Sequence, residues 1–300
     1  MHDIARPASS DSLFVTAPDG LSLHVRAHGA VNSRLPIVCL PGLSRTEADF
    51  ETLASRFASD PASPRRVYTF DYRGRGLSEH DPEWRNYDPR IELTDVIAVT
   101  TAVGIDRAIF VGTSRGGILT MLLAAARPSL IAGAVLNDIG PIIEMKGLLR
   151  IKGYVGRTPR PRDYADGVTV LRRLFSAQFP KLTDAQWLAW AQRSWIEDGG
   201  ILTARYDPKL GHTLQAVTPD TLPPPLWAQF DALPRVPVMV IRGLLSDLLS
   251  LDTVVAMRTR RSDLEVVEVP DQGHAPLLDD ETTLVKIEKL VRRCDEASAT

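Results

Sequence analysis

The chain has 300 residues, a formal net charge of -2 and 44% hydrophobic residues. Because its net charge is close to zero, the chain lacks the basic surface that binds nucleic acid or anionic lipid, and we predict neither partner. No apolar run approaches the roughly 20 residues of a membrane span, and residues 1–12 lack the apolar core of a signal peptide. The two cysteines, Cys39 and Cys294, do not suggest a disulfide framework and favour a reducing cytoplasm.

Short apolar runs alternate with helical patterns in the first part of the chain. The runs LFVTAP and LSLHVRAHG flank Asp19-Gly20, a pair that favours a hairpin turn. The next runs are PIVCLPG, RVYTFDYRG, RAIFVG and LIAGAVLND, each suited to a buried strand. Between them, TEADFETLASRFASD, IELTDVIAVTTAVG and residues 115–127 have helical spacing.

The alternation then stops, and helical patterns follow without a clear strand. The stretch TDAQWLAWAQRSWIED begins with Thr183 and Gln186 at the spacing of a capping box. We expect Trp187, Trp190 and Trp195 to share one face of this helix. Such an aromatic stripe usually packs against a core, and the alternative is that part of it lines a pocket.

Strands resume with VPVMVIRG and LEVVEVP, which brings the apolar runs to eight. Alternating strands and helices predict an α/β fold, with a mostly parallel eight-stranded sheet that is covered by helices. We expect residues 1–140 and 227–300 to form this core, and residues 141–226 to be a helical lid inserted after the sixth strand. Ligands bind at the carboxyl edge of such sheets, which is where a lid would lie.

The stretch FVGTSRGG runs from a predicted strand through Gly112, Ser114 and Gly116 into a predicted helix. Glycines on both sides of one serine suit a turn too sharp for side chains, with the hydroxyl exposed at its apex. The start of the helix also favours negative charge beside this hydroxyl. We therefore predict a nucleophile at Ser114; the alternative is a glycine-rich turn whose serine only caps the helix.

A serine needs a base before it can act as a nucleophile. Of the six histidines, His274 lies in PDQGHAPLL just past the last strand, at the carboxyl edge where Ser114 is also expected. His274 is therefore the candidate base, and His80 is the next candidate, as a substrate contact.

The base in turn needs a carboxylate to fix its orientation. Asp138 ends the run AGAVLND, and Asp247 follows VPVMVIRG. Chain order and a position after the penultimate strand favour Asp247 as the acid. Asp138 is the alternative acid, or it shapes the loop that enters the lid.

Acyl transfer also needs N–H donors for a developing oxyanion. We expect them to be the backbone N–H of Arg115, directly after the nucleophile, and that of Leu43, after PIVCLPG. The side chain of Arg115 would brace an acidic partner or meet an acidic substrate group.

Together, the motifs LPGLSR, FDYRGRGLSE, GTSRGG, RGLLSD and DQGHAPLL resemble the α/β-hydrolase superfamily, and within it lid-bearing serine hydrolases of the esterase and lactonase type. The resemblance spans about residues 12–290. It departs from the family pattern at Pro41, where a histidine is typical, and at Arg115, where an aromatic residue or methionine is common. In the family loop FDYRGRG, Asp71 and Arg73 are expected to be structural.

The resemblance implies a serine hydrolase that cleaves a carboxylic ester through an acyl-enzyme, without a cofactor. A lactonase or a C–C bond hydrolase is the runner-up, and a non-catalytic ligand receptor is the alternative from another class. Trp187, Trp190 and Tyr206 are possible pocket residues. Histidines and cysteines are too scattered to predict a metal site, no phosphate-binding loop is present, and nothing predicts an oligomeric state.

Overall fold

Eight strands form one mostly parallel sheet in the computed structural model, which describes residues 10–221 and 223–298. In spatial order they are β1 (Ser10–Thr16), β2 (Ser22–His28), β4 (Val67–Phe70), β3 (Ile37–Leu40), β5 (Ala108–Thr113), β6 (Ile131–Asn137), β9 (Val238–Gly243) and β10 (Glu265–Val269). β1 pairs antiparallel with β2 and β2 with β4, while the remaining neighbours are parallel. The predicted α/β-hydrolase fold with eight strands is confirmed. The prediction that residues 1–12 are not a signal peptide concerns a segment of which residues 1–9 lie outside the described residues.

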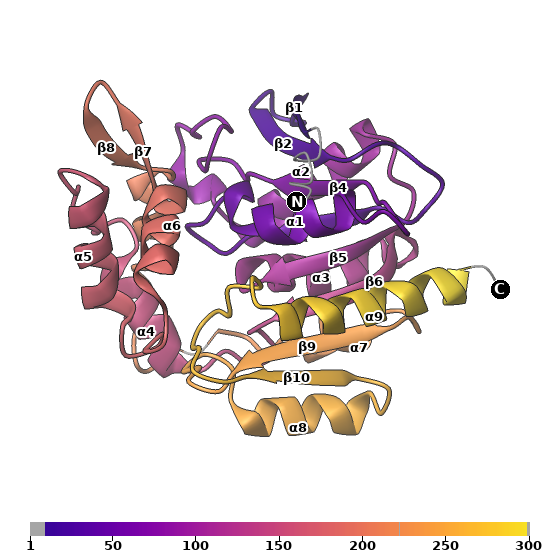
Figure 1. Cartoon of the computed structure of the whole chain (residues 1–300). Coiled ribbons are helices and arrows are strands. Elements are labelled where there is room, and N and C mark those ends of the chain that lie inside the picture. Colours follow the sequence, from indigo (N-terminus) through magenta and orange to yellow (C-terminus); the bar gives the residue numbers. More distant parts are fainter. Residues whose placement is uncertain (1–9, 222, 299–300) are drawn as a thin grey trace, which may run out of the picture.

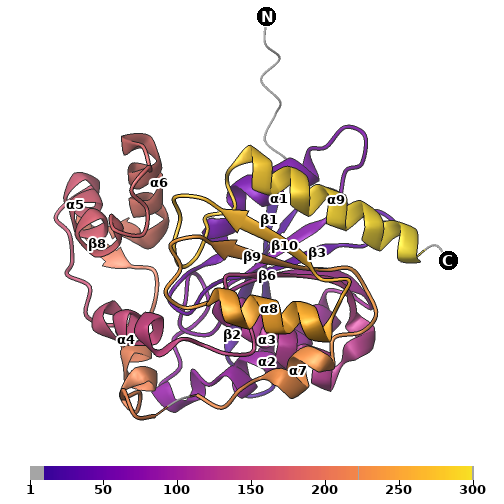
Figure 2. The same cartoon turned by 90° about the horizontal axis from the view of Figure 1, so that it is seen from below.

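Helices cover both faces of this sheet (Figures 1 and 2). One face packs against α1 (Glu51–Ala58) and α9 (Glu281–Ser298). The other packs against α2 (Pro89–Ala102), α3 (Arg115–Ala126), α7 (Trp227–Asp231) and α8 (Leu251–Arg260). The short 3-10 helices in this part are η1 (Glu47–Phe50), η2 (Trp84–Asn86) and η3 (Pro128–Leu130). Because the central strands are buried on both faces, their sequences are continuously apolar rather than alternating.

Between β6 and β9 the chain leaves the sheet and forms a separate group of elements beside the carboxyl ends of the strands (Figure 1). They are α4 (Met145–Tyr154), α5 (Tyr164–Phe175), α6 (Asp184–Ser194), β7 (Trp195–Asp198), β8 (Ile201–Ala204) and the 3-10 helix η4 (Pro208–Leu214). We call residues 141–226 the inserted segment. Its action as a lid stays a prediction.

The inserted segment contains a hairpin that the sequence analysis missed. β7 and β8 pair antiparallel around Gly199 and Gly200, which both have positive φ values, of 57° and 81°. Two such residues form the primed turn that matches the twist of a hairpin, so Gly-Gly between two strands was the available signal. The capping box of Thr183 and Gln186 is confirmed, but α6 ends at Ser194. The prediction that Trp195 continues the helix face is therefore wrong.

Aromatic side chains nevertheless hold the inserted segment together. Trp187 stacks on Trp190 with ring centroids 5.4 Å apart. Phe175 also stacks on Trp190, with ring centroids 5.0 Å apart. Trp195 is buried in the same cluster, and Leu277 from the loop after β10 packs against it. This cluster therefore ties the inserted segment to a loop of the core. Among the described residues, no helix combines the length and apolar character needed to cross a membrane.

Candidate active site

Ser114 lies between the end of β5 and the start of α3, at the sharp turn predicted for a nucleophile. Its φ of 50° is a left-handed conformation that residues other than glycine seldom adopt. The N–H groups of Arg115 and Gly116, the first two residues of α3, have no partner within the helix. The turn therefore presents the hydroxyl at the carboxyl edge of the sheet, beside donors that favour negative charge.

The flanking glycines make this turn possible. A Cβ on Gly116 would lie 1.9 Å from the carbonyl oxygen of Leu40, and one on Gly112 would lie 2.4 Å from the carbonyl carbon of Gly116. Neither distance is compatible with van der Waals contact. The glycines thus let the helix approach the neighbouring strand closely, as the sequence pattern indicated.

His274 joins Ser114 to a buried carboxylate. Its Nε2 lies 2.9 Å from the Oγ of Ser114, and its Nδ1 lies 2.8 Å from the Oδ2 of Asp138. The side chain of His274 is 6% exposed and that of Asp138 is fully buried. A histidine held in this way can accept the serine proton through Nε2 while the carboxylate stabilises the resulting imidazolium.

The structure corrects the choice of acid, because Asp138 and not Asp247 contacts His274. Asp247 instead receives two hydrogen bonds from Arg150 of α4, at 2.7 and 2.8 Å. Burial raises the pKa of Asp247, but the hydrogen bonds and the charge of Arg150, together with smaller effects of Gln178 and His274, leave this pKa below its usual value. Asp247 is therefore an ion-pair partner of the inserted segment.

Strand register explains why Asp138 reaches the histidine. Thr113 of β5 and Asn137 of β6 are register partners, so Ser114 and Asp138 leave adjacent strands side by side. Asp138 has a φ of 54°, its Oδ1 accepts a hydrogen bond from the N–H of Gly243, and its Oδ2 accepts one from the hydroxyl of Ser246. These donors fix the carboxylate toward the histidine.

Gln178 is a site residue that the sequence analysis missed. It lies in the inserted segment, and its Oε1 accepts a hydrogen bond of 3.2 Å from the N–H of His274. Its side chain also hydrogen-bonds to Asp247. A Cβ on Gly273 would lie 2.6 Å from the Cβ of Gln178, so the loop packs tightly here. Because Gln178 follows α5 without any motif, the sequence carries no signal for this contact.

The two expected oxyanion donors border the site from different elements. Leu43, after β3, lines the cavity beside Ser114, and its carbonyl is held by the Nε of Arg75 at 2.8 Å. Arg115 is the first residue of α3, so its N–H has no partner within the helix. The Nε of Arg115 lies 3.6 Å from the Oε2 of buried Glu92, so this side chain pairs with an acidic residue of the protein, as one of its two expected roles requires. The role of the two N–H groups as an oxyanion hole stays a prediction.

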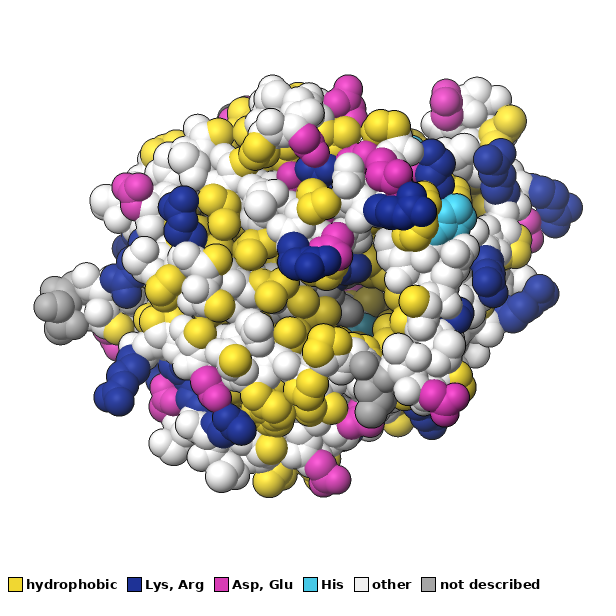
Figure 3. All heavy atoms as spheres, turned by 180° about the vertical axis from the view of Figure 1, so that it is seen from behind, with side chains coloured by type: hydrophobic (Ala, Val, Ile, Leu, Met, Phe, Trp, Pro, Cys, Tyr) yellow, Lys and Arg dark blue, Asp and Glu magenta, His cyan; other side chains and the backbone are white. Residues whose placement is uncertain are grey.

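A cavity of about 130 Å³ opens above Ser114 and His274. The inserted segment supplies much of its apolar wall, including Ile151, Tyr154, Leu171, Phe175, Trp190, Trp195 and Tyr206. Trp187 does not line it but stacks behind Trp190. His80 does not line it either, and its side chain is 58% exposed near Asp207. Seen from behind, one face of the molecule is hollowed, and hydrophobic side chains border the hollow (Figure 3).

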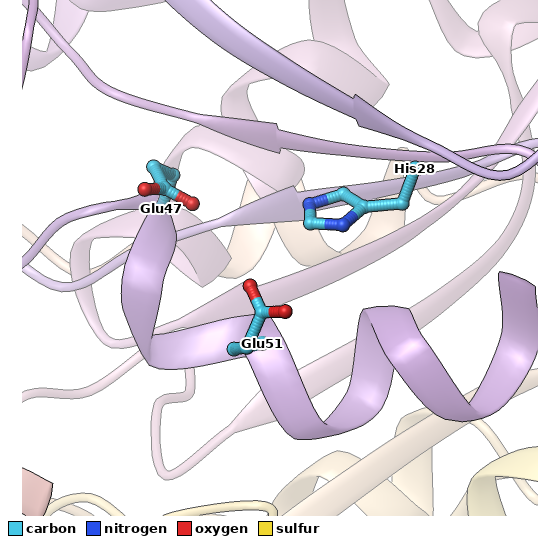
Figure 4. A group of neighbouring side chains, drawn as sticks. All are labelled: His28, Glu47 and Glu51. Carbon is cyan, nitrogen blue, oxygen red and sulfur yellow. The ribbon is translucent and has the colours of Figure 1, made fainter. Parts of the chain in front are cut away.

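One group of metal-ligand residues lies away from this cavity. Ligand atoms of His28, Glu47 and Glu51, from β2, η1 and α1, all lie within 4.8 Å of one another (Figure 4). Burial raises the pKa of Glu47 to about 7, which favours its neutral form. The guanidinium of Arg26 already lies 3.3 Å from this carboxyl, where it would repel a metal cation. The absence of a metal requirement stays a prediction.

The sheet topology, together with a serine at a strained turn from strand to helix, defines the class of α/β hydrolases. The sequence matches the model of the alpha/beta hydrolase family over residues 37–287. The chain therefore belongs to the alpha/beta hydrolase family, and it is a hydrolase.

Two relatives and one solved structure are similar over most of the chain. The 3-hydroxybutyrate-oligomer hydrolase of Cupriavidus necator is 34% identical over 247 residues, which cover 80% of this chain and 82% of the relative. The 2-(acetamidomethylene)succinate hydrolase of Mesorhizobium japonicum is 26% identical and covers 91% of this chain and 92% of its own length. An alpha/beta hydrolase structure from Novosphingobium aromaticivorans has a TM-score of 0.88 and 39% identity, over 95% of this chain and 99% of its own.

Proposed function

We propose that this protein hydrolyses a carboxylic ester through an acyl-enzyme on Ser114. The observation that supports it most directly is the hydrogen-bonded series Ser114–His274–Asp138 at the floor of the cavity. Serine attack on an ester carbonyl requires this order of nucleophile, base and acid.

The proposed reaction has two halves. In the first, Nε2 of His274 takes the hydroxyl proton while Oγ of Ser114 bonds to the acyl carbon. The resulting oxyanion accepts hydrogen bonds from the N–H groups of Leu43 and Arg115. The C–O bond to the alcohol then breaks, and His274 protonates the leaving oxygen. In the second half, His274 deprotonates a water that attacks the acyl carbon, and its proton returns to Ser114 as the acid leaves.

The substrate class that we propose is a small ester of a short hydroxy acid. The relative from Cupriavidus necator is named for the hydrolysis of 3-hydroxybutyrate oligomers and is similar over 80% of this chain. The small apolar cavity suits a short acyl group better than a long one. We further propose a cytoplasmic location, since Cys39 and Cys294 are both buried and unpaired.

A second candidate is hydrolysis of a lactone or of a C–C bond by the same three residues. The similarity to 2-(acetamidomethylene)succinate hydrolase over 91% of this chain supports only the coarser point that the substrate need not be an ester, since that name describes an open-chain acetamido compound without an ester group.

The test is hydrolysis of 3-hydroxybutyrate dimer and trimer, together with p-nitrophenyl esters from acetyl to dodecanoyl. Ser114→Ala should lower kcat by about 10⁴-fold or more, because it removes the nucleophile. Ser44→Ala is the matched control, since it removes a hydroxyl that also lines the cavity but does not contact His274. Ester turnover that survives in Ser114→Ala would refute the assignment. Turnover of lactones or C–C substrates alone would favour the second candidate.

A further inference from the structure

Two arginines line the cavity above Ser114. Arg45 belongs to the loop after β3, and Arg193 is near the end of α6 in the inserted segment. Much of the remaining wall is hydrophobic or aromatic. A guanidinium beside an apolar wall loses hydration and needs an anionic or hydrogen-bonding partner.

Arg45 already has its partners within the protein. Its Nε and Nη2 donate to the two oxygens of Asp49 at 2.7 and 2.5 Å, and its Nη1 donates to the hydroxyl of Ser194 at 2.8 Å. This fork uses all three nitrogens of the guanidinium. Arg45 is therefore a fixed part of the wall.

Arg193, in contrast, lacks a hydrogen-bond partner for one of its guanidinium nitrogens. Its Nε is buried and has no hydrogen-bond partner among the described residues. The nearest carboxylate oxygen, on Asp49, lies 3.7 Å away and already accepts a hydrogen bond from Arg45. The side chain of Arg193 keeps 21% exposure and lines the cavity, so a ligand can reach it.

The charges around the cavity favour an anion. Among the described residues that line it, the charged side chains apart from His274 are Arg45, Arg193 and Asp49, which leaves one positive charge in excess. Asp279 also acts on Arg193 electrostatically but does not line the cavity, and burial raises the pKa of Asp279. A monoanion would balance this excess, whereas a dianion would have to be desolvated at greater cost.

We propose that Arg193 binds a free carboxylate of the substrate, so that the preferred substrate is an ester that also carries a carboxylic acid group. This inference rests on the proposed function, because it names a feature of the substrate of the same site. An Arg–carboxylate pair with two parallel hydrogen bonds would satisfy the buried Nε together with one Nη. The carboxylate would also orient the ester relative to Ser114.

The first experiment compares acids with their methyl esters. One pair is p-nitrophenyl hydrogen glutarate and p-nitrophenyl methyl glutarate, with the carboxylate on the acyl side. The other is 3-acetoxybutanoate and its methyl ester, with the carboxylate on the alcohol side. We expect the wild type to prefer the acid in at least one pair. Arg193→Gln should lower the ratio of kcat/KM for acid over methyl ester by about tenfold or more.

Two further variants make this result specific. Arg172→Gln removes an arginine of the same inserted segment that pairs with Asp184 and does not line the cavity, so it should leave the ratio unchanged. Arg193→Lys keeps the charge without the fork and should restore part of the preference. An equal loss for acid and methyl ester in Arg193→Gln would indicate a merely structural role and overturn the proposal.

A binding measurement separates this inference from the proposed function. Calorimetric titration of the full chain with the monoanions butanoate and pentanoate, with butanamide as the neutral control, needs no turnover. We expect both acids to bind the wild type and to lose about tenfold or more in affinity to Arg193→Gln. Binding that depends on Arg193 without any ester turnover would refute the proposed function alone. Equal affinities for the wild type and Arg193→Gln, or no binding of either acid, would refute the carboxylate site.

Discussion

Gly116 is the residue at which the active-site turn tolerates least change. A Cβ there would lie 1.9 Å from the carbonyl oxygen of Leu40, which belongs to the backbone of the neighbouring strand and cannot move aside alone. We predict that Gly116→Ala lowers the free energy of unfolding by about 3 kcal/mol or more. Chemical denaturation of the purified variant measures this loss.

Gly153→Ala is the control for this prediction. Gly153 lies in α4, and a Cβ there would meet nothing within 4 Å. Alanine should therefore be neutral there, or stabilise by up to about 1 kcal/mol through its higher helix propensity. A Gly116→Ala protein as stable as the wild type would mean that α3 and β3 are farther apart than described.

Gln178 offers a second prediction at the residue scale. Because it holds the backbone N–H of His274, Gln178→Met should loosen the histidine loop and lower kcat/KM by roughly tenfold. The thermal midpoint should fall by only a few degrees, since the two side-chain hydrogen bonds that are lost contribute about 1 kcal/mol each. Gln215→Met, an exposed glutamine of the inserted segment, is the control and should have neither effect. A wild-type kcat/KM in Gln178→Met would show that the contact does not position His274.

Sequence alone could locate Ser114 and His274, because each lies in a local motif beside a recognisable strand. It could not choose between Asp138 and Asp247, because both follow strands that end at the same edge of the sheet. The difference lies in how far each is from its strand. Asp138 follows β6 directly, whereas Asp247 comes after the further residues Leu244, Leu245 and Ser246, which let the chain turn toward Arg150. Such a choice depends on tertiary contacts.

At the scale of elements, α6 presents two stacked tryptophans with different surroundings. Trp190 lines the cavity, whereas Trp187 stacks behind it and touches the cluster of the inserted segment. We predict that Trp187→Leu and Trp190→Leu both lower the thermal midpoint, because both remove buried aromatic area. Trp190→Leu alone should move the optimum of an ester series toward longer acyl chains, because it enlarges the cavity.

The p-nitrophenyl ester series measures this difference directly. An unchanged chain-length optimum in Trp190→Leu, or the same change in Trp187→Leu, would contradict the proposal that the acyl group binds in the cavity beside Trp190.

The strands of the core were predictable because a strand that is buried on both faces of a parallel sheet has a continuously apolar sequence. The sequence does not predict the hairpin β7–β8, because WIED directly continues a good helical pattern. Strand pairing with ILTA, around two glycines with positive φ, overrides that pattern. Short strands outside the main sheet carry too few residues for their period to be recognised.

At the scale of the whole molecule, the raised pKa of Glu47 predicts how the free energy of unfolding depends on pH. Burial and the neighbouring Asp71 raise its pKa from 4.5 to about 7 in the folded state. The folded protein therefore binds this proton more tightly than the unfolded chain, and stability falls as pH rises from 4.5 through about 7. Glu47→Gln removes the charge that burial disfavours, and at pH 8 it should stabilise the protein by about 3 kcal/mol.

Urea denaturation at pH 5 and at pH 8 tests this prediction. At pH 5 the gain should be below about 1 kcal/mol, because Glu47 is then neutral in the folded protein and only partly ionised in the unfolded chain. Glu51→Gln, a change to an exposed carboxyl of the same group, is the control for a general charge effect. A gain in Glu47→Gln that is equal at both pH values would contradict the account.

The most direct test of the central claim is the rate at which an alkyl fluorophosphonate labels the protein, followed by intact mass, because labelling requires an activated serine but no knowledge of the substrate. We predict that the wild type and Asp247→Asn react at similar rates, that Asp138→Asn reacts at least about 100-fold more slowly, and that Ser114→Ala does not react. Labelling of Ser114→Ala, or a larger loss in Asp247→Asn than in Asp138→Asn, would contradict the catalytic series of Ser114, His274 and Asp138.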